Sequence, residues 1–431
     1  MVGSFLLSKK IVNFFVSFVL FLLTTACVSH TQEHEELRSL YIKSNYTKAL
    51  THLESSSLKS SSQNRLLYLL EKGALLDKLK EKEKARRTLF LADRLIDKQR
   101  TSSISQTAAS FLLNDSTMDY SGELFEIITL HSLLALSFIE EGATKQARVE
   151  AQQINKRLHE FTRNLGDKNN SYQKDAFALY LSGIIYEALG EVDDAIIDYK
   201  RSLRVYNSPV YKKFHDGEIK EQITKALYRL AKKRKREEIT QKIEATNPQI
   251  KQKLEKQTGS LIVFHELGTL SPKRAKNFFF DLGSSKPFRF SFPYIAQKAP
   301  SSGETGLLLE KKFFQGTEAV NLNALASHTL EERRLRLMLK GTVRLLLKSK
   351  ITNFIEDELG PLAGFLATSL AMATEVADTR GWMFLPKQFF ITRVDLPPGS
   401  YKVRAVSDSL PEKKERTVKI KAGKLVLIRA S

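Results

Sequence analysis

Apolar residues recur at helical spacing through Ala176–Pro209, which reads AFALYLSGIIYEALGEVDDAIIDYKRSLRVYNSP. The pattern predicts two amphipathic helices that face each other across a Leu-Gly-Glu turn. Gly183 and Ala195 are small where two helix backbones must approach closely. Tyr186 and Tyr199 are large where the space between the helices needs filling. Because one such pair cannot bury its apolar face alone, we expect further pairs beside it.

The spacing of this unit resembles a tetratricopeptide (TPR) repeat. Weaker pairs precede it at Leu37–Ser56, Arg65–Asp97 and Glu123–Leu158, with an insertion at Thr101–Ser121. The repeats are unequally spaced, so the sequence predicts a degenerate, interrupted solenoid. Such a stack offers a concave surface for a partner peptide or helix, although insertions can also fill the groove and the helices can pack as a bundle without a partner. The small residues at the close-packing positions of the earlier pairs are Ala49, Gly73, Ala85 and Ala147.

The first 27 residues have the layout of a secretory signal peptide. Lys9 and Lys10 precede the apolar run Ile11–Leu23, and small residues lead to Cys27. A cysteine at this place resembles a bacterial lipobox, although the usual leucine three positions earlier is Thr24. The resemblance implies cleavage before Cys27, lipid on its thiol and, because aspartate does not follow it, an outer-membrane destination facing the periplasm. The alternatives are an uncleaved membrane anchor or a signal peptide followed by an idle cysteine.

Net charge indicates the class of partner, and the cysteine count indicates whether a disulfide can form. The chain of 431 residues carries a formal net charge of +20. This balance favours acidic partners such as anionic lipid, nucleic acid or acidic protein. The most basic stretch, LAKKRKREE, lies in a predicted long helix at Asp216–Ala245 and is interpreted as a solvated helix face, so no nucleic acid is expected. Cys27 is the only cysteine, so no intramolecular disulfide can form.

The pattern changes after a polar segment at residues 246–258. Strands are predicted near Leu261–Phe264, Phe288–Ala296 and Gly306–Phe314, and again along the last forty residues. Between them, Leu330–Lys350 and Asn353–Asp378 are predicted as two helices, and the uncharged centre of the second is too short for a bilayer span, which favours a buried core helix. The fold class is therefore α+β, an N-terminal all-α TPR-like solenoid followed by a mixed domain with a β-rich ending that resembles small β-sandwich modules. The expected divisions are 1–26 signal peptide, 27–36 tether, 37–245 helical domain, 246–258 linker and 259–431 α+β domain.

One constellation in the second half could bind a ligand or a partner. In the sequence ADTRGWMFLP, Asp378, Arg380 and Trp382 alternate, so in extended backbone they share a face. An Asp–Arg pair beside the only tryptophan could anchor a partner backbone. The favoured alternative is structural, with Asp378 pairing locally and Trp382 filling the junction between helices and sheet.

Taken together, these features resemble a family of bacterial TPR-containing outer-membrane lipoproteins of unassigned function. The segment around Asp378–Trp382 is its most specific part. The resemblance implies an envelope lipoprotein and supplies no reaction.

Signatures of catalysis and metal binding are missing from the sequence. No phosphate-binding Gly-rich loop or Gly-x-Ser-x-Gly elbow occurs, and His30 and His34 lack a third ligand, so neither a cofactor nor a metal is expected. The leading hypothesis is a non-enzymatic scaffold tethered through Cys27, whose helical groove binds an envelope protein. A second hypothesis is a regulator of an envelope enzyme such as a peptidoglycan synthase. A third is an enzyme that uses Asp378 and Arg380.

Overall fold

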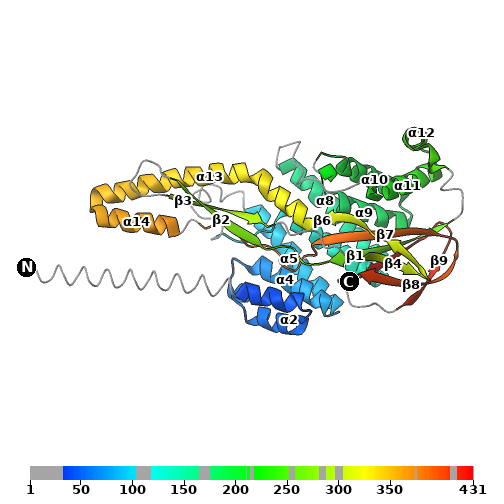
Figure 1. Cartoon of the computed structure of the whole chain (residues 1–431), viewed down its shortest axis with the longest axis horizontal. Coiled ribbons are helices and arrows are strands. Elements are labelled where there is room, and N and C mark those ends of the chain that lie inside the picture. Colours follow the sequence, from blue (N-terminus) through cyan, green and yellow to red (C-terminus); the bar gives the residue numbers. More distant parts are fainter. Residues whose placement is uncertain are drawn as a thin grey trace, which may run out of the picture.

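A computed structural model describes residues 33–102, 118–164, 175–209, 211–213, 218–251, 258–280, 288–296, 304–373, 376–407 and 415–430. The expected signal peptide and Cys27 lie outside these residues. The predicted fold class is confirmed, since a helical N-terminal part is followed by strands mixed with helices. Figure 1 shows α10 to α12 above the strands of the large sheets, α2 and α4 to the left of them, and one long helix, α13, extending from the body.

The N-terminal part consists of helices that pack in successive pairs, as the repeat pattern predicts. A helix at 33–42 precedes α2, and α4 packs on α5, α7 on α8, and α9 on α10. The bounds are α2 Tyr46–Ser55, α3 Ser57–Ser60, α4 Arg65–Lys78, α5 Lys82–Ser102, α7 Leu124–Glu140, α8 Thr144–Asn164, α9 Ala176–Leu189, α10 Val192–Tyr206, α11 Glu218–Lys233 and α12 Glu237–Thr246.

Close approach within two of these pairs depends on glycine. A Cβ atom added to Gly73 would lie 2.5 Å from Cδ2 of Leu89, and one added to Gly183 would lie 2.5 Å from the ring of Tyr199. These distances are shorter than any real carbon contact, so the partner side chain occupies the space that a larger residue would need. The α9–α10 turn also requires Gly190, whose φ of +79° is left-handed.

The strands form two four-stranded sheets and a separate hairpin. One sheet has the order β10-β1-β7-β6, in which β1 and β10 are parallel and the other neighbours antiparallel; the other is antiparallel with the order β5-β4-β8-β9, and β2 pairs with β3. Buried side chains from both large sheets, such as Val263, Leu307 and Val403, share one apolar cluster, so the sheets form a sandwich. The bounds are β1 Gly259–Leu267, β2 Lys273–Phe280, β3 Phe288–Ile295, β4 Thr305–Leu309, β5 Lys312–Gln315, β6 Thr317–Asn321, β7 Gln388–Leu396, β8 Gly399–Ser407, β9 Arg416–Ile420 and β10 Leu425–Ala430.

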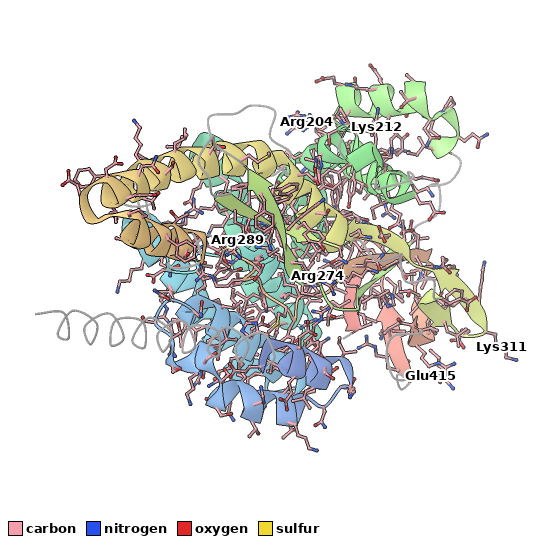
Figure 2. The ribbon with its side chains drawn as sticks, turned by 60° about the vertical axis from the view of Figure 1, so that its left-hand side comes forward. Arg204, Lys212, Arg274, Arg289, Lys311 and Glu415 are labelled. Carbon is pink, nitrogen blue, oxygen red and sulfur yellow. The ribbon has the colours of Figure 1, made fainter. Side chains whose placement is uncertain are left out.

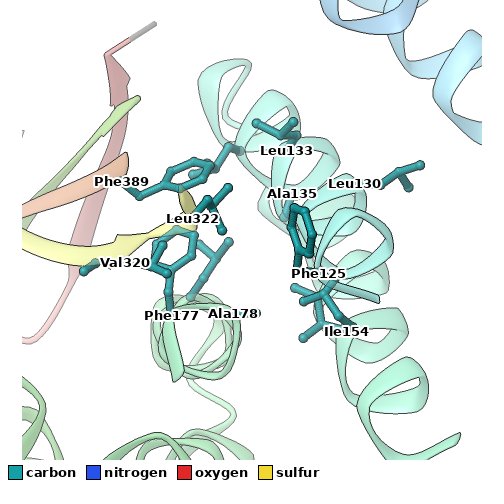
Figure 3. Close-up of a cluster of buried hydrophobic side chains, with 14 of the residues drawn as sticks. Phe125, Leu130, Leu133, Ala135, Ile154, Phe177, Ala178, Val320, Leu322 and Phe389 are labelled. Atoms are coloured by element: carbon teal, nitrogen blue, oxygen red, sulfur yellow. The ribbon is translucent and has the colours of Figure 1, made fainter. Parts of the chain in front are cut away.

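The outer surface of the first sheet packs on the helical part, and the two share a second core. Phe177 of α9 stacks on Phe389 of β7 with ring centroids 4.6 Å apart, and both rings are buried (Figure 3). The hydroxyl of Tyr206 in α10 donates to the carbonyl of Ala319 in β6 at 2.7 Å. One contiguous apolar cluster therefore runs from the helix pairs into the sheet.

A projecting arm is formed by helices α13 (Leu322–Leu359) and α14 (Pro361–Ala373) together with the β2–β3 hairpin. With 38 residues, α13 is about 57 Å long. It packs on β3 at Gly341, where an added Cβ would lie 2.0 Å from the ring of Phe290. Figures 1 and 2 show α13 leaving the body and α14 turning back beside it.

Several local predictions for the chain after residue 215 are wrong. The long helix predicted at Asp216–Ala245 is divided into α11 and α12, because Lys235 adopts a left-handed φ of +53°. The hydrophobic pattern does not predict β2, which begins at Lys273. The helix predicted to be buried at the apolar segment is α14 in the arm, where Phe365 is 55% exposed.

Candidate functional site

The face lined by α4, α7 and α9, the first helices of three pairs, is the surface on which the sequence predicts partner binding. In the structure this inner face is covered. The sheet containing β1 and β7 covers part of it, and residues 376–387, which we call the strap, cross it between α14 and β7 without regular secondary structure. The inner face is therefore covered by the second half of the chain, whereas the sequence pattern allowed for filling by insertions between repeats.

Two buried glutamates on the inner face hold the backbone of the strap. Glu126 of α7 accepts a hydrogen bond from the backbone N–H of Trp382 at 2.9 Å. Glu71 of α4 accepts from the N–H of Met383 at 2.6 Å with one carboxylate oxygen and from the N–H of Phe384 at 3.2 Å with the other. Charge-assisted bonds of this kind are stronger than neutral ones. Three successive amides of the strap are thus fixed by side chains from two different repeats.

Burial determines the electrostatics of these carboxyl groups. It raises the pKa of Glu71 well above the ordinary value, although the two strap amides act in the opposite direction. It also raises the pKa of Glu126, against the nearby charge of Lys273. Without the strap amides, the buried Glu71 carboxylate would lose the donors from Met383 and Phe384, whereas Glu126 would keep the Tyr120 hydroxyl and the Glu123 N–H. The strap therefore stabilises Glu71 more than Glu126.

The structure brings Asp378 and Arg380 together and places both against the helices. The Arg380 guanidinium donates to both Asp378 oxygens, at 2.9 and 2.7 Å. It also donates to the side chain of Asn64 at 3.2 Å and to the carbonyl of Met118 at 2.9 Å, and it lies over the ring of Tyr120. This arrangement agrees with the interpretation that Asp378 pairs locally. The polar groups of Asp378 and Arg380 bind each other and the helices.

Trp382 does not share an exposed face with that pair, because its side chain is fully buried. Among the described residues its indole Nε1 has no hydrogen-bond partner. The ring borders a cavity of about 30 Å³ between the helices and the first sheet, which Tyr41, Phe384 and Arg429 also line. This volume corresponds to about one water molecule, so the cavity is too small for an organic ligand.

A network of ion pairs joins the end of β10 to the helices beside this cavity. The buried Arg429 guanidinium contacts Glu266 of β1 at 2.6 Å and Asp77 of α4 at 2.8 Å. Lys82 of α5 contacts Asp77 at 2.9 Å and Glu140 of α7 at 2.6 Å. Positive neighbours hold the pKa of Asp77 below its ordinary range in spite of burial. The network therefore connects the helical part to the sheet through paired charges.

A second buried cluster joins three helices around His131 of α7. Its Nδ1 lies 2.9 Å from Glu150 of α8 and its Nε2 lies 3.3 Å from Asp93 of α5. Arg157 also contacts Asp93, at 2.6 Å. Burial lowers the pKa of His131, but the bonds to the two carboxylates outweigh burial and raise it overall. With Nδ1 bonded to Glu150 and the Asp93 carboxylate close to Nε2, the two nearby negative charges favour an imidazolium that joins the helices.

The described residues contain neither a metal site nor a membrane span. No group of three or more His, Cys, Asp and Glu side chains among them is placed to hold a metal ion. No helix in the described part of the chain is both long and apolar enough to cross a bilayer.

An open groove lies at the far end of the helical part, between α10 and the start of α12. It encloses about 430 Å³ and is lined by Ile196, Ile197 and Ile239 with charged residues around them. Ile197 is 54% exposed, and Asp193 at the rim is paired with Arg236 at 3.0 Å. An apolar floor with a charged rim is suited to a short peptide or helix.

The remaining residues singled out from the sequence are packing residues in the structure. Leu89 and Tyr199 fill the spaces left by Gly73 and Gly183, and the hydroxyl of Tyr199 donates to Glu187. Sequence reasoning missed Glu71 and Glu126, although single glutamates inside RLLYLLEKGALL and LFEIITL are the signal that could have revealed them. The other packing residues are Ala85, Ala147 and Ala195, all buried, and Tyr186, which is 7% exposed.

Comparison with known proteins gives only distant structural likeness. Neither a known family profile nor a curated protein sequence matches the chain. Solved structures similar to it include BtubC (BKLC) from P. vanneervenii, at 18% identity over 51% of this chain and 74% of that one, with a TM-score of 0.30. A putative kinesin light chain from Podospora anserina, with nearly identical TPR-like repeats, is 13% identical over 53% and 97%, with a TM-score of 0.32. MamA AMB-1 is 12% identical over 52% and 93%, with a TM-score of 0.29. Scores this low carry no argument about function, and the resemblance to bacterial TPR lipoproteins stays a prediction.

Proposed function

We propose that this protein is a non-enzymatic scaffold of the bacterial cell envelope, tethered by lipid on Cys27 and binding a partner protein through the groove between α10 and α12. The observation that carries the proposal is that the inner face of the helical part is occupied by the strap, whereas the α10–α12 groove is open. Binding at the inner face would require breaking three buried hydrogen bonds to two glutamates. The α10–α12 groove requires no such rearrangement.

The composition of the groove supports a protein partner. Ile197 is half exposed although it is large and apolar, and Ile196 and Ile239 continue the apolar floor beside it. The rim carries charges of both signs, from Lys200, Lys235 and Arg236 and from Asp193, Glu237 and Glu238, so a protein partner with complementary charged side chains can pair with it.

The groove is tested by a photo-reactive amino acid placed at position 197 in cells. The control places the same group at position 42, because Ile42 is similarly exposed, at 59%, on the opposite end of the helical part. We expect a discrete cross-linked species from position 197 that position 42 does not give and that Lys200→Glu with Lys235→Glu weakens. Equal cross-linking from both positions would contradict groove binding.

The tether is tested separately by labelling with palmitate and fractionating membranes, comparing the native chain with Cys27→Ala. We expect label in the outer-membrane fraction only when Cys27 is present. If neither chain is labelled, residues 11–23 act as a plain anchor or a cleaved signal, and the lipid tether is wrong. The groove test does not depend on this result.

A further inference from the structure

The projecting arm exposes far more apolar surface than the body of the protein. On α13, Val343, Leu347, Ile351 and Phe354 are spaced by four, four and three residues, so they follow one another along a single face. All four side chains are exposed, Phe354 by 64%. Contiguous exposed apolar surface of this kind marks an interaction site. The other large apolar side chains exposed on the arm are Met338, Leu346, Phe365, Phe278 and Phe279.

The same arm is basic along most of its length, although the last turn of α13 carries Glu356, Asp357 and Glu358. Between positions 333 and 350 the sequence of α13 has no acidic residue, and neither β2 nor β3 has one. Arg274 and Lys276 on β2 and Lys350 on α13 are exposed beside the apolar residues. Figure 2 shows Arg274 and Arg289 on the hairpin alongside α13. The basic residues in this stretch of α13 are Arg333, Arg334, Arg336, Lys340, Arg344, Lys348 and Lys350.

The charge determines what can cover this apolar face. A second copy would bring two basic arms together, and like charges at close range oppose such pairing. A surface that is both apolar and negatively charged is complementary. An anionic lipid bilayer has these properties, because interfacial helices bury aromatic and aliphatic side chains at the headgroup boundary while Lys and Arg pair with anionic headgroups.

The first described residues lie toward the same end of the molecule as the tip of the arm. In Figure 1 the dark-blue start of the described chain and the turn between α13 and α14 lie toward the same end of the long axis. A chain spans at most about 3.6 Å per residue, so lipid on Cys27 would hold Glu33 within about 20 Å of a membrane. The arm would then point toward the surface that carries the tether.

From these observations we infer that the arm formed by α13, α14 and the β2–β3 hairpin binds the surface of an anionic lipid bilayer, independently of any lipid on Cys27. The apolar face of α13 enters the headgroup region, and the basic residues of α13 and β2 contact the anionic headgroups. The contact is a second attachment that orients the body relative to the membrane. This inference goes beyond the scaffold proposal and does not need the α10–α12 groove.

The test uses the unacylated chain from Val28 to Ser431, which keeps every described residue, and measures its co-sedimentation with vesicles. One set contains phosphatidylethanolamine with phosphatidylglycerol, and the other contains phosphatidylcholine alone. We expect binding to the anionic vesicles that weakens as salt rises, with little binding to the neutral ones. Failure to bind anionic vesicles would overturn the inference, whatever the palmitate labelling shows.

Matched variants distinguish membrane binding by the arm from nonspecific binding through any exposed apolar residue. Leu347→Ser, Ile351→Ser and Phe354→Ser combined should weaken binding at least about tenfold, because each removes a side chain that enters the headgroup region. Ile42→Ser, Leu91→Ser and Val149→Ser change residues of similar exposure on the helical part and should change binding less than about twofold. Circular dichroism checks that both triple variants remain folded. An equal loss in the two triple variants would overturn the inference.

A charge pair completes the test. Arg274→Glu with Lys350→Glu should weaken binding to the anionic vesicles, whereas Lys232→Glu with Lys233→Glu in the exposed last turn of α11 should not. If the second pair weakens binding as much, the contact is unspecific attraction by net charge and the arm has no special role. A dimer in solution that the Leu347, Ile351 and Phe354 changes dissociate, together with absent vesicle binding, would show that a second copy covers the face.

Discussion

The strap and the arm are adjacent in the chain and have opposite relations to solvent. The strap is an irregular segment, yet Trp382 and Leu385 are fully buried in it and its amides are bound by Glu71 and Glu126. The arm consists of regular helices, yet Phe354 and Phe365 are more than half exposed. Irregular backbone can enter a core only when its polar groups find partners there, and two glutamates supply them. Among the described residues, the exposed apolar face of α13 has no such cover.

The comparison also changes the expected role of the helical repeats. In this protein the inner face of the repeats organises the second half of the chain, through the strap, the Phe177–Phe389 stack and the Arg429 ion pairs. The surfaces that we propose for other molecules, the α10–α12 groove and the arm, are ones that this internal packing leaves open.

The largest expected loss of stability comes from replacing the buried tryptophan of the strap. Trp382→Ala removes a fully buried ring and should lower the free energy of unfolding by about 3–5 kcal/mol. Phe354→Ala on the arm should change it by no more than about 0.5 kcal/mol, because that ring is 64% exposed. Urea unfolding of both variants measures the difference. Similar losses in the two variants would remove the contrast between strap and arm.

The next effect concerns a glutamate that binds the strap. Glu71→Ala leaves the amides of Met383 and Phe384 buried without their acceptor and should cost about 2–4 kcal/mol of stability. The matched control is Glu83→Ala on α5, which removes an exposed carboxylate that pairs with Arg87 one turn away. This change should cost less than about 0.5 kcal/mol. Thermal unfolding distinguishes the two, and a Glu71 variant as stable as the control would argue against strap anchoring.

A smaller effect is expected where helices α9 and α10 approach. Gly183→Ala would force its Cβ into the ring of Tyr199 and should destabilise the protein by about 1–3 kcal/mol. At Gly381 in the strap the nearest atom to an added Cβ is 3.5 Å away, an ordinary contact, so Gly381→Ala should be nearly neutral. Urea unfolding of the pair tests whether the helix pair is packed as tightly as described.

The smallest expected effect is a pH dependence of stability that arises from His131 in the helical part. The pKa of His131 is raised in the folded protein, so its contribution to stability is full below the unfolded pKa of about 6.5 and is lost as pH rises through the raised folded pKa. Stability of the native chain should therefore fall over that window more than stability of His131→Gln does. Urea unfolding at a series of pH values gives both curves, and parallel curves would show that His131 is not charged in the fold.

The local sequence pattern predicts much of the helical architecture. It does not predict where the strap lies. Gly183, Ala195 and Tyr199 predict a helix pair because the signals lie within one repeat. The strap position depends on Glu71 and Glu126, which are about 250 to 310 residues away from it in the chain, and no periodicity connects such distant residues. The sequence of α9 does indicate that another part of the chain covers it. Its apolar residues occupy the whole circumference of the helix, and such a helix is buried on all sides. The arm was mistaken for core because α14 is apolar and uncharged, which describes its composition and not its surroundings.

The central claim is that the inner face of the helical repeats is closed by the strap of the same chain. Amide hydrogen exchange of the native protein tests this most directly, by comparing a peptide that spans Arg380–Pro386 with one from α7. The account predicts that the amides of Trp382, Met383 and Phe384 exchange as slowly as those of α7, because their hydrogen bonds to Glu126 and Glu71 open only when the core opens. Exchange of these amides as fast as in an exposed loop would contradict the claim and return the inner face to the candidate partner surfaces.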